Sequence, residues 1–148
     1  MQQTLILVKP DGVQRRLVGT ITQRFEAKGL RLAGLKLLQA SQTLAEKHYA
    51  VHKGKSFYDS LLKFITGGPT VAMVWEGREA VAVARALMGP TDGTKAPPAT
   101  IRGDFALSVQ NNLVHGSDSP ENAKLEIGLW FRPEELVQYT PTDVLWVG

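Results

Sequence analysis

Thr4-Leu5-Ile6-Leu7-Val8 is the first apolar stretch of the chain, and the turn residues Pro10-Asp11-Gly12 follow it closely. A short apolar run that is partly β-branched and ends in turn residues is typical of a buried strand. The run is too short for the core of a signal peptide or for a membrane span. The sequence therefore predicts a strand here, in a protein that we expect to be soluble and cytoplasmic.

Apolar residues on the C-terminal side of this strand alternate between strand and helix patterns. Further strands are predicted over 30–40, with an irregularity near Gly34, over 71–75 and over 113–115. Helices are predicted from Val18 to a stop at Gly29, and over 43–52, 56–66, 78–88, 105–109 (a short piece) and 120–130. Two helix starts are marked by a capping-box pattern, Thr43 with Glu46, and by Ser119-Pro120. This order predicts an α/β or α+β fold.

The composition is that of one globular domain over residues 1–148, with 43% hydrophobic and 21% charged residues. A formal charge of +3 favours anionic ligands but is too small to indicate nucleic acid by itself. The absence of cysteine excludes thiolate catalysis and disulfides. The segment 89–103 holds three prolines and three glycines, and loops of this length are usually functional or disordered.

Two patterns that suggest a ligand are non-specific. Gly54-Lys55-Ser56 resembles the end of a P-loop, but Tyr49 stands where that motif needs its first glycine. His48 and His52 lie four residues apart on one predicted helix face, which is a spacing that a metal can bridge. No carboxylate accompanies them in a metallohydrolase pattern, so we expect surface or capping histidines and no metal site built from protein side chains.

The stretch Asn111-Asn112-Leu113-Val114-His115-Gly116-Ser117-Asp118 places an imidazole among hydroxyl, carboxylate and amide groups, with Glu126 eleven residues after the histidine. Histidine has a neutral, nucleophilic fraction near neutral pH, and a nucleophilic ring needs a partner that fixes it. A lone histidine at a strand end is more often structural. Three cations stand at the ends of predicted elements, namely Lys9, Arg85 and Arg102. If these cations converge on His115, they form a site for a polyphosphate.

Four segments together resemble the nucleoside diphosphate kinase family, over nearly the whole chain: 9–13, 100–105, 112–118 and 126–131. The resemblance implies a ferredoxin-like α/β sandwich, in which helices cover a four-stranded antiparallel sheet and a long loop precedes the last strand. It also implies transfer of the γ-phosphoryl group of a nucleoside triphosphate, typically ATP, to nucleoside diphosphates. The reaction would follow a ping-pong mechanism, with Mg²⁺ carried by the nucleotide phosphates.

The same resemblance implies a role for each site residue. His115 matches the histidine that is phosphorylated, Glu126 the carboxylate that holds its ring, and Tyr49 and Ser117 the neighbouring hydroxyls. The residues that match the family's phosphate-binding and ribose-binding groups are Lys9, Arg85, Thr91, Arg102 and Asn112. Lys9 also belongs to the catalytic set. Phe57 matches the aromatic ring that stacks on the nucleotide base, and Leu61 and Val109 complete that slot. From the residues alone, Tyr49 and Phe57 fit core packing equally well.

Family members assemble as oligomers, so the resemblance implies a homo-oligomer, with a hexamer favoured over a tetramer. Gly93 stands where many relatives carry proline in the loop that joins subunits, and we expect it to add flexibility there. A nucleic-acid-binding regulatory protein that retains the fold is one alternative, which the sequence pI of about 9.3 permits. A signalling carrier phosphorylated on histidine is another. An intact nucleotide slot favours the kinase over both.

Overall fold

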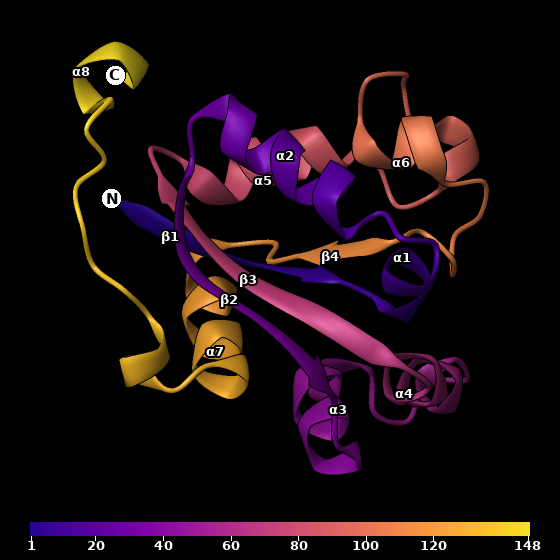
Figure 1. Cartoon of the computed structure of the whole chain (residues 1–148). Coiled ribbons are helices and arrows are strands. Elements are labelled where there is room, and N and C mark those ends of the chain that lie inside the picture. The colour runs from indigo at the N-terminus through magenta and orange to yellow at the C-terminus, as the bar shows by residue number, and fades with distance from the viewer.

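A four-stranded antiparallel sheet forms the centre of the computed structural model, which describes all of residues 1–148 (Figure 1). Its order is β2-β3-β1-β4, so the first and third strands lie in the middle. The strands are β1 (Gln2–Val8), β2 (Arg31–Gln39), β3 (Pro69–Gly77) and β4 (Val114–Gly116). All four predicted strands are confirmed. β3 extends two residues beyond the prediction at each end, because its flanking residues also pair with β1 and β2.

Helices cover both faces of this sheet, as Figure 1 shows. One face carries α2 (Val18–Lys28), α5 (Ala80–Met88) and α6 (Ile101–Phe105), and the other carries α3 (Gln42–His48), α4 (Tyr58–Thr66) and α7 (Pro120–Trp130). Short helices complete the chain: α1 (Pro10–Gln14), η1 (Ala50–His52), η2 (Gly93–Lys95), η3 (Pro133–Glu135) and α8 (Val144–Val147). The expected ferredoxin-like sandwich is confirmed. No helix is both long enough and apolar enough to cross a membrane.

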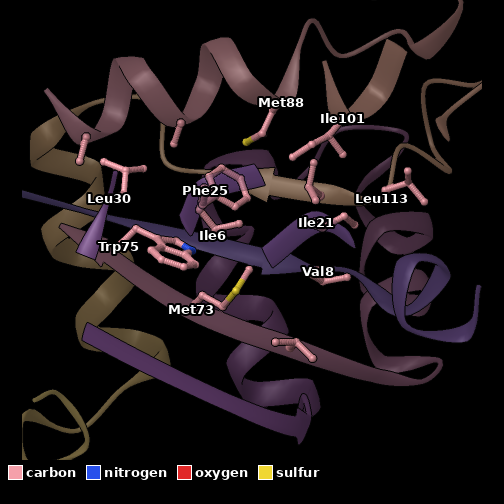
Figure 2. Packing of buried hydrophobic residues seen from close by; sticks show 14 of the residues in the cluster. Ile6, Val8, Ile21, Phe25, Leu30, Met73, Trp75, Met88, Ile101 and Leu113 are labelled. Carbon is pink, nitrogen blue, oxygen red and sulfur yellow. The ribbon is translucent and has the colours of Figure 1, made fainter. Parts of the chain in front are cut away.

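β1 is buried on both faces because successive side chains of a strand point in opposite directions. Leu5 and Leu7 pack under α3, α4 and α7, whereas Ile6 and Val8 pack under α2, α5 and α6, and all four are fully buried. Figure 2 shows the second cluster, in which Ile6 and Val8 meet side chains from the helices and from β3. A continuous apolar run thus produced a central strand with a core on each side.

The irregularity predicted in β2 is confirmed, since the register with β3 shifts between Leu32 and Gly34. A Cβ on Gly34 would lie 2.8 Å from Leu136 Cδ2 and 3.0 Å from Phe131 Cε2. The glycine therefore lets the segment after α7 pack closely against the sheet.

Three local predictions about helices were wrong. No helix spans 105–109; α6 ends at Phe105 and begins after Thr100, whose side chain accepts a hydrogen bond from Gly103 N. The predicted helix over 43–52 is interrupted at Tyr49, between α3 and η1. Its cap is also not Thr43, because Ser41 Oγ accepts a hydrogen bond from Leu44 N. Side-chain caps at Ser41 and Thr100 fix the starts of α3 and α6, whereas no side-chain cap accompanies the interruption at Tyr49.

Gly93 does not make its loop flexible. It is buried at the start of η2, its N–H donates to Ser108 O at 3.2 Å, and a Cβ there would lie 2.5 Å from the Ala106 carbonyl carbon. Close packing against Ala106, in place of the expected flexibility, accounts for the glycine.

The cap of α3 gives a direct test of the corrected boundary. Replacing Ser41 by alanine should lower the free energy of unfolding by about 1 kcal/mol, because the Leu44 N–H loses its partner. Thr43→Ala is the matched control: Thr43 is exposed within the helix, and alanine there should be neutral or slightly stabilising. Urea denaturation of both variants measures this difference. A larger loss for Thr43→Ala would restore the original capping prediction.

Candidate active site

A cleft of about 1020 Å³ brings together eleven of the twelve predicted site residues. They come from helices, strands and loops that are spread along the chain from the end of β1 to α7. These lining residues are Lys9, Tyr49, Phe57, Leu61, Arg85, Thr91, Arg102, Val109, Asn112, His115 and Glu126. The twelfth, Ser117, is fully buried and contacts the cleft through Glu126. The cations at the ends of separate elements line the same cleft as His115, which is the arrangement that the polyphosphate hypothesis requires.

His115 lies in the middle of β4, and its ring is held by a carboxylate from α7. The His115 Nε2 atom lies 3.1 Å from both carboxylate oxygens of Glu126. Ser117 Oγ donates a hydrogen bond of 2.6 Å to Glu126 Oε1, and Leu5 N donates to Ser117 Oγ at 3.3 Å. The carboxylate is thus tied to the central strand through Ser117, and the imidazole is tied to the carboxylate.

This hydrogen bond determines which nitrogen of His115 can react. A carboxylate accepts hydrogen bonds, so a neutral His115 carries its proton on Nε2 and leaves the lone pair of Nδ1 free. Burial alone would raise the pKa of Glu126, but hydrogen bonds from His115 and Ser117 and nearby positive charge outweigh it and lower the pKa below its ordinary value. Glu126 is therefore ionised at neutral pH and remains an acceptor.

His48 is a core residue of the site, and the expectation of a surface or capping histidine was wrong. Its side chain is buried, and its ring stands edge-on to His115 with centroids 4.5 Å apart. Trp130 Nε1 donates to His48 Nδ1 at 3.1 Å. Burial, with the charge of His115, lowers the pKa of His48 to about 3. The ring is therefore neutral, and the Trp130 contact places its proton on Nε2.

The grouping of His48, His115 and Glu126 is the one cluster with metal-ligand chemistry, with ligand atoms within 4.8 Å of one another. A metal on His48 Nε2 would move the ring proton to Nδ1, where it would face the Trp130 N–H. Glu126 already accepts from His115 and Ser117. The hydrogen bonds thus fit a neutral histidine pair better than a metal centre.

Tyr49 packs against one side of the cluster formed by His48, His115 and Glu126. Its ring lies edge-on to His48 with centroids 4.7 Å apart. Burial, reinforced by the charge of Glu126, raises the pKa of Tyr49 to about 12. The phenol therefore keeps its proton and is available as a hydrogen-bond donor.

Burial changes the pKa values of two cations in the cleft, Lys9 and Arg102. Burial lowers the pKa of Lys9 to about 8, although Asp11 acts in the opposite direction, and lowers that of Arg102 to about 10 with help from Arg85. Positive charge held in a poorly solvated cleft is stabilised by an anionic ligand. The Lys9 Nζ atom donates to Asn112 Oδ1, which aims it into the cleft.

Arg102 also organises the backbone that carries the histidine. Its Nε atom donates to Asn112 O at 3.2 Å, Nη2 to Val114 O at 2.7 Å and Nη1 to Gly89 O at 2.9 Å. A guanidinium has five N–H donors, so two remain for a ligand. Arg85 Nη1 similarly donates to Gly116 O at 3.1 Å.

The mouth of the cleft is apolar. The Phe57 ring is 45% exposed at the start of α4, and Val109 is 57% exposed. Leu61 lies one helical turn after Phe57. Exposed apolar groups on both sides of an open slot suit a flat ligand ring better than core packing.

Sequence reasoning missed Trp130 and misread His48. The signals were present: Glu126 and Trp130 are four residues apart on α7 and so share one face, and His48 adjoins Tyr49. Only the packing of α3 against α7 brings the two pairs together.

The comparisons with known proteins agree with this geometry. The family model for nucleoside diphosphate kinase matches residues 2–136. The nucleoside diphosphate kinases of Thermosynechococcus vestitus and Carboxydothermus hydrogenoformans are 58% and 57% identical to this chain over 147 residues. These alignments cover 99% of this chain, and 98% and 99% of the two relatives. The resemblance inferred from the motifs is confirmed.

Solved structures give the same answer. A halophilic nucleoside diphosphate kinase from Halobacterium salinarum, in complex with CDP, has a TM-score of 0.97 and 46% identity, covering 99% of this chain and 98% of that one. A nucleoside diphosphate kinase family protein from Babesia bovis has a TM-score of 0.98 and 44% identity over 100% of both chains. The chain therefore belongs to the nucleoside diphosphate kinase family, whose members are phosphotransferases.

The burial of His48 predicts a specific loss of stability in acid. The unfolded chain takes up a proton on His48 below a pKa of 6.5, whereas the folded state resists until a pH of about 3. Stability present above pH 6.5 is therefore lost as the pH falls towards 3, by about 2 kcal/mol between pH 7 and pH 5. Urea denaturation at the two pH values measures it. His48→Gln should remove this part of the pH dependence, and His52→Gln, at a partly exposed position, should retain it. Equal behaviour of both variants would contradict the burial argument.

Proposed function

We propose that the chain is a nucleoside diphosphate kinase that works through a phosphohistidine at His115. The γ-phosphoryl group of a nucleoside triphosphate, typically ATP, moves to His115 and then to a nucleoside diphosphate. One observation carries this proposal: the Nδ1 lone pair of His115 is left free by Glu126 in a cleft that Lys9, Arg85 and Arg102 help to line. The CDP held by the Halobacterium salinarum protein supports a nucleotide as the ligand.

In the first half-reaction, His115 Nδ1 forms a bond to the γ-phosphorus while the bond to the bridging oxygen breaks. The electron pair of that bond leaves with the nucleoside diphosphate. The imidazole becomes a cation, and the ionised Glu126 stabilises it through the Nε2 hydrogen bond. The second half-reaction reverses these steps with another diphosphate. One pocket thus serves donor and acceptor in turn, which is a ping-pong mechanism.

The cations supply electrostatic stabilisation. Phosphoryl transfer proceeds through a loose transition state, for which alignment and positive charge around the phosphoryl oxygens matter most. We assign Arg85, Thr91 and Arg102 to the phosphates, and Lys9 and Asn112 to the phosphates and ribose. Tyr49 and Ser117 act next to His115, Ser117 by holding Glu126.

Kinases that act on nucleotides use a divalent cation, and we propose that it is Mg²⁺ carried by the nucleotide phosphates. The acids that line the cleft are Asp118 and Glu126, and Glu126 is already hydrogen-bonded to His115 and Ser117. Phosphate oxygens and water are ligands that Mg²⁺ prefers, so the nucleotide can supply them.

Assembly and location complete the proposal. We infer a homo-oligomer of single-domain chains, with a hexamer favoured and a tetramer as the alternative. Leu35 and Leu37 are exposed on the edge strand β2, and Leu145 and Trp146 are exposed at the C-terminal end, which supports association. Cytoplasmic location stays a prediction. The cleft shape favours nucleotide chemistry over a nucleic-acid-binding or signalling-carrier role.

Labelling tests the nucleophile. Incubation with [γ-³²P]ATP and Mg²⁺ should give a phosphoprotein that is labile in acid, stable in alkali and discharged by GDP or CDP. His115→Ala should abolish the label because it removes the imidazole whose Nδ1 atom Glu126 leaves free. His52→Ala serves as the control and should label normally. Label that persists in His115→Ala would show that another residue is the nucleophile.

The stacking role of Phe57 predicts an effect on every base. Phe57→Ala should raise KM about tenfold for ADP, GDP and CDP alike, since stacking on one aromatic ring contributes about 1–3 kcal/mol without reading the base. Phosphorylation of His115 by phosphoramidate, which has no base, should stay unchanged. Steady-state assays with the three diphosphates measure the effect, and a change confined to one base would assign Phe57 a different role.

A further inference from the structure

Leu113 has an unusual backbone conformation two residues before His115. Its φ angle is +75°, in the left-handed region, and its side chain is fully buried in the core. Leucine rarely adopts this conformation, because its Cβ then lies too close to a carbonyl oxygen. The surrounding structure must therefore hold it in place.

This turn decides which side chains reach the cleft. Residues three apart in an unbroken strand point to opposite faces. Asn112 and His115 are three apart, yet both line the cleft. The reversal at Leu113 makes this arrangement possible, since β4 begins only after it, at Val114.

The segment after β1 forms hydrogen bonds with both backbone polar groups of Leu113, its N–H and its C=O. Asp11 Oδ2 accepts a hydrogen bond of 3.1 Å from Leu113 N, and Lys9 N donates one of 2.8 Å to Leu113 O. Gly12 allows this contact to be close, because a Cβ there would lie 3.2 Å from Leu113 O. α1 is thus packed directly against the strained turn.

The Asp11 side chain has one hydrogen-bond partner, Leu113 N, and its charge also acts on Lys9, whose pKa it raises. It forms no ion pair, and its second oxygen, Oδ1, is buried without a hydrogen bond. An unpartnered buried carboxylate oxygen is unfavourable for folding. The hydrogen bond that Asp11 accepts from Leu113 N is therefore the interaction that accounts for the position of Asp11.

We propose that Asp11 is a positioning residue, which holds the left-handed turn at Leu113 and so places Asn112 and His115 on the same side of the cleft. The inference rests on the proposed function of His115 and adds a requirement to it. Asp11 does not line the cleft, and it acts on His115 through its hydrogen bond to the backbone of Leu113. Without it the turn relaxes, and both side chains lose their alignment.

Two substitutions at Asp11 separate its roles as a hydrogen-bond acceptor and as a charge. Asp11→Ala removes both, whereas Asp11→Asn keeps an acceptor oxygen for Leu113 N and removes the charge next to Lys9. Asp59→Ala is the matched control, because Asp59 is an exposed acid in the first turn of α4 and does not line the cleft. Single-turnover labelling of His115 is measured with ATP and with phosphoramidate.

Asp11→Ala should slow labelling by both donors, by about 10²-fold if alignment of the ring is lost. Asp11→Asn should stay within a few-fold of wild type, and Asp59→Ala should match wild type. Hydrogen exchange at the Leu113 amide should be fast in Asp11→Ala and slow in the other proteins, which detects the turn directly in a folded variant. 

Three results would overturn the proposal: equal slowing in Asp11→Asn, which would assign the effect to charge; slowing with ATP only, which would place it on nucleotide contacts; or wild-type rates in Asp11→Ala. Failure of wild type to label at His115 is a separate outcome, because it would reject the proposed function before Asp11 is considered.

Discussion

The carboxylate of Glu126 is the contact on which the site depends. It accepts from His115 Nε2 and from Ser117 Oγ, and Ser117 is in turn bonded to the backbone of Leu5 in the central strand. Three elements, β1, β4 and α7, therefore meet at one ionised group. If that group were lost, the imidazole could rotate, and either of its nitrogens could carry the proton. The fold fixes the chemistry by fixing this carboxylate.

The cations around His115 show what the site costs in stability. Lys9 and Arg102 are buried with lowered pKa values, and Leu113 is held in a left-handed conformation. None of these features stabilises the chain by itself. The buried cations become favourable when a polyphosphate enters the cleft, and the turn at Leu113 serves to align His115 with it. Such features are typical of sites whose residues are selected for function.

Much of this arrangement could be predicted from local sequence. The apolar run at 4–8 marks a strand with no solvent-facing side, and Gly34 marks the irregularity in β2. The family resemblance that the motifs carry implied twelve site residues, and the structure gathers eleven in one cleft, with Ser117 buried next to Glu126. Their roles stay predictions until the variants are tested.

The rest depended on contacts between distant segments. Apolar spacing alone does not reveal that His48 meets Trp130, 82 residues away, or that Asp11 meets Leu113, 102 residues away. The start of α6 was also misplaced, because Thr100 Oγ1 caps the helix by accepting a hydrogen bond from Gly103 N. Polar contacts of this kind are specified by geometry and not by periodicity.

The central claim is that Glu126 leaves Nδ1 of His115 as the nucleophile, and the position of the phosphoryl group tests it most directly. A ³¹P–¹⁵N correlation spectrum of the phosphorylated protein, labelled with ¹⁵N-histidine, identifies the bonded nitrogen. The geometry predicts that phosphorus couples to Nδ1 of His115 while Nε2 keeps its proton. Coupling to Nε2, or to a nitrogen of His48 or His52, would contradict the account.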